Sequence, residues 1–126
     1  MFKGIESILL FSENAHELAD FYEEKVGLKL TNEFMMEGKD EGYEFKMKSG
    51  SSLNVLDHSE VKGKNKNPQR MIINFEVDDI EKEVKRIKKN KVKLIQDIYH
   101  IEGYGHIATF SDIDGNYFQL VQVRAK

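Results

Sequence analysis

Apolar and polar positions follow one order along the chain, and that order occurs twice. The pattern predicts an apolar strand and its exit over 7–14, ending in Asn14, and the same over 72–79, about 65 residues later, ending in Asp79. Asn and Asp side chains are suited to cap a helix at these points. The apolar spacing after each of them predicts helices over 15–25 and 80–89.

The correspondence continues beyond the helices. After each helix the pattern predicts three strands, in the first half over 28–34, 43–48 and 52–57 and in the second over 92–98, 106–110 and 117–123. Glycine-containing loops around 38–42 and 103–105, and turns at 49–51 and 112–116, separate these strands. Each half therefore predicts the order β-α-β-β-β and an α+β fold. We expect module one over 1–60, a polar linker over 61–70 with the chain's only proline, and module two over 71–126.

Composition removes several classes of function. The 126 residues carry a net charge of -3, whereas a general nucleic-acid binder normally has a basic excess. No apolar run approaches the roughly 18 residues that a membrane span needs, and the N-terminal stretch lacks the features of a signal peptide. The chain has no cysteine, which excludes disulfides, thiolate metal sites and cysteine nucleophiles. We expect a cytoplasmic protein that binds neither nucleic acid nor membrane.

Three short motifs carry a family resemblance: DFY at 20–22 followed by VGL at 26–28, VDDI at 77–80, and DIDGNYFQL at 112–120. Together with the doubled module they resemble the vicinal oxygen chelate superfamily, which includes glyoxalase I, bleomycin-resistance proteins, fosfomycin-resistance transferases and extradiol dioxygenases. Ile113 departs from the family, which usually has proline at this turn. The resemblance implies that the two modules form a curled mixed sheet around a cleft with the helices on its outer face. It also implies a homodimer.

The resemblance further implies a divalent metal held by His and Glu side chains on the strands of both modules. The family's ligand positions fall here on Ser7, Asn54, Ile72 and Gln119. Isoleucine cannot coordinate a metal, and the two amides lack the charge of a carboxylate. Shifting the alignment by one residue does not restore three strong ligands. We therefore expect that the metal ligands have been lost and that the protein holds no metal and no other cofactor.

Strand alternation predicts which side chains line the cleft. If Asn54 and Gln119 face it, the residues expected to bind a ligand are Ser7, Leu9, Phe11, Asn54, Ile72, Asn74, Tyr117 and Gln119, with Tyr104 added from a loop as a stacking surface. Such a surface suits a partly apolar organic molecule held by a few hydrogen bonds. The pattern does not assign a face to the strands 43–48 and 106–110.

Residues for acid–base chemistry are few. The four histidines, at 16, 58, 100 and 106, show no recognised metal-binding spacing. His106, beside a glycine loop, and Glu76, the only carboxylate on the predicted cleft face, are the candidate general bases. A structural or solvated role is the favoured interpretation of both.

The sequence therefore predicts a protein of the glyoxalase/bleomycin-resistance type that binds a small, partly apolar organic molecule, and favours a binding protein over an enzyme. Two alternatives remain open. One is a glyoxalase-like metal-dependent lyase, isomerase or dioxygenase. The other is a non-catalytic interaction module.

Overall fold

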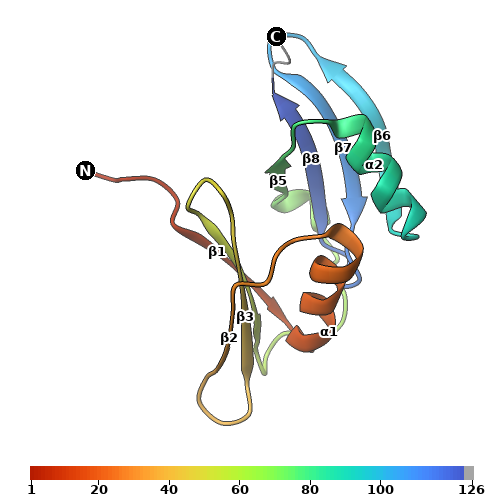
Figure 1. Cartoon of the computed structure of the whole chain (residues 1–126). Coiled ribbons are helices and arrows are strands. Elements are labelled where there is room, and N and C mark those ends of the chain that lie inside the picture. Colours follow the sequence, from red (N-terminus) through yellow and green to blue (C-terminus); the bar gives the residue numbers. More distant parts are fainter. Residues whose placement is uncertain (124–126) are drawn as a thin grey trace. The chain divides into compact units, whose positions relative to one another are not determined.

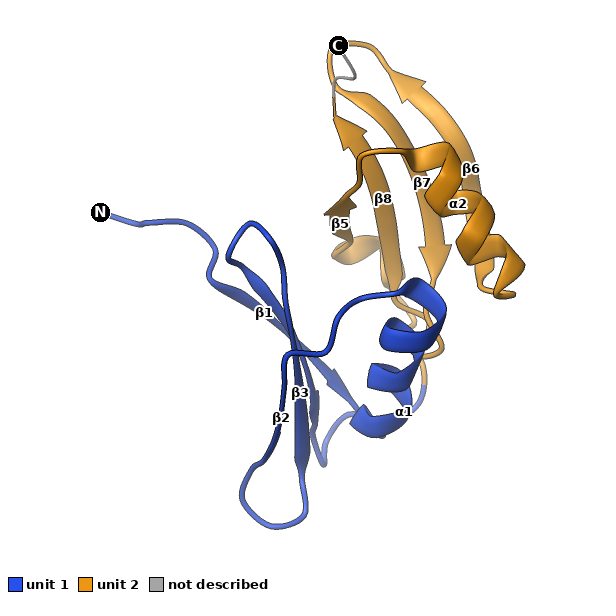
Figure 2. Cartoon of the chain, in the orientation of Figure 1, with its two compact units in different colours: residues 1–63 blue, residues 64–126 orange. Residues whose placement is uncertain are grey.

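The computed structural model describes residues 1–123 (Figure 1). Residues 124–126, which the sequence analysis assigns to module two, lie outside the described residues. The chain divides into two compact units, Met1–Gly63 and Lys64–Lys126 (Figure 2). No helix within residues 1–123 has the length and apolar character needed to cross a membrane.

Unit 1 forms a four-stranded mixed sheet with one helical segment. Its elements are β1 (Ser7–Ser12), α1 (Ala15–Asp20), the π-helical turn η1 (Phe21–Val26), β2 (Asn32–Met35), β3 (Glu41–Lys46) and β4 (Ser52–Asp57). The strand order is β1-β4-β3-β2. The first and last strands run parallel, and the other neighbours are antiparallel.

Unit 2 repeats this plan. Its elements are the short 3-10 helix η2 (Pro68–Arg70), β5 (Ile73–Glu76), α2 (Ile80–Lys89), β6 (Lys93–Ile101), β7 (Gly105–Ser111) and β8 (Tyr117–Val123). The strand order is β5-β8-β7-β6, again with the first and last strands parallel. The predicted α+β class and the two βαβββ modules are thus confirmed.

Both helices begin at the predicted caps. The Asn14 side chain accepts a hydrogen bond from the Glu17 N–H at 3.1 Å, and that of Asp79 accepts one from the Lys82 N–H at 3.2 Å. Each bond satisfies one of the N–H groups that a helix start leaves without a partner. The second helix has the predicted bounds, whereas the first changes from α to π geometry at Phe21. Within the π turn the adjacent side chains of Phe21 and Tyr22 are both buried.

Each helix covers one side of its own sheet with apolar side chains. In unit 1 the buried residues are Leu18 and Tyr22 on the helical segment and Phe45, Leu53 and Val55 on the strands. In unit 2 they are Val84 and Ile87 on α2 and Phe110, Phe118 and Leu120 on the strands. The rings of Phe110 and Phe118 stack with centroids 5.7 Å apart. Burial of these side chains supplies the main stabilisation of each unit.

Four of the strands that follow the helices differ from the predicted ones in their bounds. The strand after the first helix begins at Asn32 rather than 28, because the Leu28 N–H bonds to the Tyr22 carbonyl at the helix end and cannot pair with β3. The third strand of unit 1 is Glu41–Lys46 rather than 43–48, since the turn at Met47–Gly50 ends it early. The pairing of β6 with β7 extends to Ile101, so β6 is longer and β7 begins at Gly105.

A matching hydrogen bond joins the helix to the last strand in each unit. The Asp57 carboxylate at the end of β4 accepts from the Ala15 N–H at 2.7 Å, and the Gln122 amide oxygen on β8 accepts from the Ile80 N–H at 2.8 Å. The second oxygen of Asp57 also accepts from the Glu41 N–H at 2.8 Å, so this carboxylate ties α1 to the start of β3. A carboxylate at a helix N-terminus is further stabilised by the helix dipole.

The two side chains accept hydrogen bonds from different numbers of backbone N–H groups. Their truncation is therefore expected to lower the free energy of unfolding by different amounts. Asp57→Ala removes the acceptor of two backbone N–H groups and is expected to lower the free energy of unfolding by about 2–4 kcal/mol, at about 1–2 kcal/mol for each N–H left without a partner. Gln122→Ala, the matched control, removes one acceptor and is expected to cost about half as much. Urea denaturation followed by circular dichroism measures both. Equal losses in the two variants would contradict the double role of Asp57.

Candidate functional site

Within residues 1–123, and taking each unit by itself, one side of each sheet carries no helix of that unit; we call it the helix-free face. The bonds of Asp57 and Gln122 to the helix starts place these two side chains on the helix side of their sheets. Directly paired residues on neighbouring strands point to the same side, and successive residues on a strand point to opposite sides. The strand register therefore assigns the other positions, separately in each unit.

In unit 2 a row of polar side chains crosses the helix-free face, one from each strand. Its members are Asn74 on β5, Gln119 on β8, Thr109 on β7 and Gln96 on β6. The Gln119 Nε2 donates to Thr109 Oγ1 at 3.0 Å, which confirms that the two side chains meet on this face. Thr109 is buried, Gln119 is half-buried, and the two outer members are exposed.

A mainly apolar row runs beside the polar one. It consists of Glu76 on β5, Val121 on β8, Ile107 on β7 and Tyr99 on β6. The two central side chains are buried, whereas Glu76 is exposed and the Tyr99 ring is 40% exposed. The helix-free face of unit 2 thus places hydrogen-bonding amides and a hydroxyl next to aliphatic and aromatic groups. This combination suits recognition of an organic molecule with a few polar atoms.

Unit 1 repeats the two rows with different residues. The polar row holds Leu9, Asn54, Glu44 and Asn32, and the apolar row holds Phe11, Leu56, Gly42 and Phe34. Thr31 Oγ1 donates to Glu44 Oε1 at 2.8 Å. The Phe34 ring lies over Gly42, where an added Cβ would stand 2.3 Å from a ring carbon. A side chain at position 42 would therefore have to displace the Phe34 ring from this row.

The structure assigns most of the residues predicted to bind a ligand to the helix-free faces. Ser7, Leu9, Phe11 and Asn54 share that face in unit 1, and Asn74, Tyr117 and Gln119 share it in unit 2. Two lie elsewhere: Ile72 directly precedes β5, and Tyr104 lies in the turn between β6 and β7. The register also assigns the strands that the sequence left open. Glu44 and Lys46 lie on the helix-free face, as do Ile107 and Thr109, whereas Tyr43 and Phe45 lie on the helix side.

The two candidate general bases lie on opposite sides of one sheet. Glu76 pairs with Val121 on the helix-free face, whereas His106 pairs with Gln122 on the helix side. Their side chains cannot meet at one reacting atom. An acid–base pair of Glu76 and His106 is therefore ruled out by the register, and each would have to act alone.

The residues at the family's metal positions do not fit a catalytic divalent ion. Ile72 offers no donor atom, and Asn54 and Gln119 offer neutral amide oxygens in place of carboxylates. Within residues 1–123, no three His, Cys, Asp or Glu side chains gather closely enough to hold a metal ion. A catalytic site normally supplies three protein ligands to the metal.

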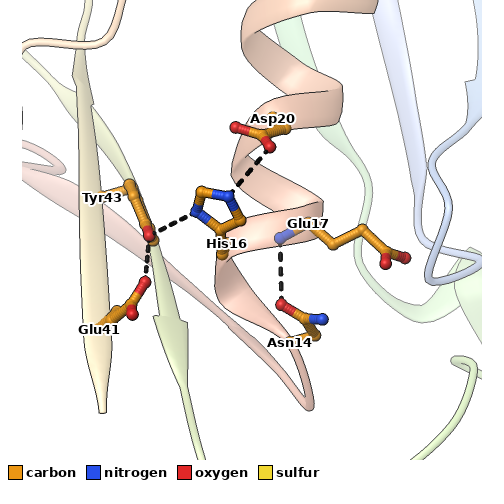
Figure 3. Close-up of polar contacts among 6 residues, drawn as sticks. All are labelled: Asn14, His16, Glu17, Asp20, Glu41 and Tyr43. Atoms are coloured by element: carbon orange, nitrogen blue, oxygen red, sulfur yellow. Dashed lines mark hydrogen bonds and ion pairs between the residues drawn. The ribbon is translucent and has the colours of Figure 1, made fainter. Parts of the chain in front are cut away.

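Sequence reasoning did not foresee a polar network on the helix side of unit 1 (Figure 3). Tyr43 on β3 donates its phenolic proton to the Glu41 carboxylate, and its oxygen lies 2.9 Å from His16 Nδ1 in a second hydrogen bond. The other ring nitrogen of His16 lies 3.3 Å from the Asp20 carboxylate, one turn further along α1. The network therefore links α1 to β3. Only the His16–Asp20 spacing of four residues was visible in the sequence, because the contact to Tyr43 depends on how α1 packs.

Burial raises the pKa of the Tyr43 phenol well above its ordinary value, and the hydrogen bond to the Glu41 carboxylate raises it further. The phenol therefore keeps its proton and acts as a fixed donor to Glu41. A proton held this firmly serves structure rather than acid–base catalysis near neutral pH.

Comparison with known proteins places these observations in a family. The chain matches the family model described as Glyoxalase/Bleomycin resistance protein/Dioxygenase superfamily over residues 4–120. No curated protein matches the sequence. Many solved structures share the fold, and three of them illustrate its range.

The first is TnmS3, an antibiotic binding protein from Streptomyces sp. CB03234, with 21% identity, a TM-score of 0.78 and coverage of 98% of each chain. The second is a glyoxalase family protein from Enterococcus faecalis, with 20% identity, a TM-score of 0.75 and coverage of 96% of this chain and 98% of that one. The third is the fosfomycin resistance protein FosX from Listeria monocytogenes, with 15% identity, a TM-score of 0.73 and coverage of 99% and 97%. At these identities the similarity shows a common fold.

The raised pKa of Tyr43 predicts a steeper loss of stability at alkaline pH. Because the folded state holds the proton more tightly than the unfolded state, the stabilisation is complete below about pH 10 and falls as the pH rises above it, by up to about 1.4 kcal/mol per pH unit. Tyr43→Phe is expected to remove this part of the slope, and Tyr99→Phe, which alters an exposed ring, to retain it. Urea denaturation at a series of pH values from neutral to about 11 measures the slopes. Identical slopes in Tyr43→Phe and the unaltered protein would contradict the assignment.

Proposed function

The chain belongs to the glyoxalase/bleomycin resistance protein/dioxygenase superfamily, and from this premise we propose that it binds a small, partly apolar organic molecule without the family's metal. Each sheet would offer its own helix-free face as a binding surface. In this proposal the protein sequesters or presents its ligand and does not transform it.

The observation that carries the proposal is the pair of rows on the helix-free face of unit 2. Gln119 and Thr109 are linked to each other and flanked by Asn74 and Gln96, so amide groups are available for hydrogen bonds to a ligand. The adjoining row supplies Val121, Ile107 and the exposed ring of Tyr99 for apolar contact. Burial of ligand surface against such groups contributes about 25 cal/mol for each Å² of apolar area.

The metal positions support binding over metal-dependent chemistry. An enzyme of this superfamily uses its ion to polarise adjacent oxygens of the substrate and to stabilise the charge that develops on them. Ser7, Asn54, Ile72 and Gln119 supply neither the charge nor the number of ligands for such an ion. The amides retained at 54 and 119 can instead donate and accept hydrogen bonds.

Two further points belong to the proposal. TnmS3 has the same fold and is described as an antibiotic binding protein, which supports a ligand of comparable chemistry for this chain. The resemblance to the superfamily also implies a homodimer whose second copy completes the binding surface. Sedimentation at micromolar concentration tests that part, and a monomer that binds ligand with full affinity would contradict it.

Binding is tested with protein freed of metal by EDTA and a panel of bleomycin, fosfomycin and aromatic antibiotics, first by thermal shift and then by calorimetry. We expect at least one compound to bind, with an affinity unchanged when divalent cations are restored. Gln119→Ala is expected to weaken that binding about threefold to tenfold, the equivalent of one or two hydrogen bonds. Lys85→Ala, an exposed change on α2, is the matched control and is expected to have no effect.

Two outcomes would contradict the proposal. Binding that requires a divalent ion and is lost with Gln119→Ala would show that the family's metal site persists, and lyase, isomerase and dioxygenase activities would then be assayed. Equal losses with Gln119→Ala and Lys85→Ala would show that the ligand does not contact the helix-free face.

A further inference from the structure

Two histidines face each other across the hairpin that joins β6 and β7. His100 and His106 are directly paired residues of these antiparallel strands, separated by the turn at 102–104. Their ring centroids lie 4.9 Å apart, with the planes tilted by 42°. His100 is exposed and His106 is half-buried, so solvent reaches the pair. The sequence showed only that the two residues flank a glycine-containing turn.

The separation of the rings suits joint coordination of one ion. Imidazole nitrogens bind zinc and similar ions at about 2.0–2.1 Å, and two such ligands at a bond angle of about 90–109° hold their ring centres about 4.5–5.2 Å apart. The observed 4.9 Å falls within this interval. The separation of the rings is therefore compatible with coordination of a common ion by one nitrogen from each ring.

We propose that His100 and His106 form a two-imidazole chelate for a divalent transition-metal ion on the surface of unit 2. Imidazole suits copper, nickel and zinc, whereas magnesium and calcium require oxygen ligands. Since no third His, Cys, Asp or Glu joins the pair within the described residues, water fills the remaining coordination positions and exchange with solvent is rapid.

The strand backbones hold the two histidines in position for this chelate. The strands pair on both sides of the histidines, at Tyr99 with Ile107 and at Ile101 with Gly105, so the two Cα atoms are held opposite each other. After the first imidazole binds, the second meets the ion at a high effective concentration. Such linkage commonly raises affinity at least 100-fold over a single ligand.

The chelate is distinct from the proposed binding surface. His106 pairs with Gln122, whose side chain bonds to the start of α2, so the two histidines lie on the helix side of the sheet. Gln119 and its row lie on the helix-free face. Metal binding at the histidines and ligand binding at the amides therefore fail or succeed independently.

The test is titration of the whole EDTA-treated protein with nickel, zinc or copper chloride by calorimetry. We expect one ion per chain, in the affinity order copper, nickel, zinc, and no binding of magnesium. His100→Ala and His106→Ala are each expected to lower affinity about 100-fold, to that of a single imidazole, and the double variant is expected to abolish binding at the hairpin. His58→Ala, the matched control at another exposed histidine, and Gln119→Ala are expected to retain full affinity.

Two results would overturn the proposal: unchanged affinity in His100→Ala, or an equal loss in His58→Ala. His100→Ala changes an exposed residue on the outermost strand of the sheet, so it keeps the test valid if His106→Ala fails to fold. A second readout is the pH. Only neutral imidazole binds the ion, so lowering the pH from about 7.5 to about 5 must release it.

Discussion

The parallel pairing of the first strand with the last is the constraint on which each module depends. A parallel connection needs a crossover, and here the crossover begins with a helix that lies against one side of the sheet. The helix is held at its start by a side chain of the last strand, Asp57 in one unit and Gln122 in the other. Once one side is covered in this way, the other side is left without a helix and its side chains are available for recognition.

The repeated pattern made much of this fold predictable from the sequence. Asn14 and Asp79 marked both helix starts because a cap is a local interaction between residues three positions apart. Strand alternation also separated Leu53 and Val55 from Asn54, since one side of the sheet must be apolar to pack against a helix. The strand ends were less predictable. Leu28 has a suitable side chain for a strand, but its N–H is used by the helix end, which composition does not reveal.

The candidate site was predictable only in part because its geometry depends on register. Alternation along β6 would place Gln96 and His100 on the same side, yet two irregularities in the pairing with β7 put Gln96 opposite Thr109 and His100 opposite His106. A bulge adds one residue to a strand and reverses the side on which later residues point. The contact of His16 with Tyr43 was likewise not predictable from the sequence, because it joins residues of a helix and a strand and depends on how the two pack.

The bulged edge strand also explains how one sheet can present two kinds of chemistry. On the helix-free face the row through Gln119 offers neutral amides, which exchange hydrogen bonds with a ligand but bind cations weakly. On the other side, beyond the apolar contacts of α2, the His100–His106 pair offers imidazole nitrogens, which are strong ligands for transition metals. In the proposed function the recognition surface carries no cation, so its selectivity would depend on shape, apolar area and amide hydrogen bonds. In the proposed chelate, metal affinity would depend on the pairing of β6 with β7, which holds the two histidines opposite each other.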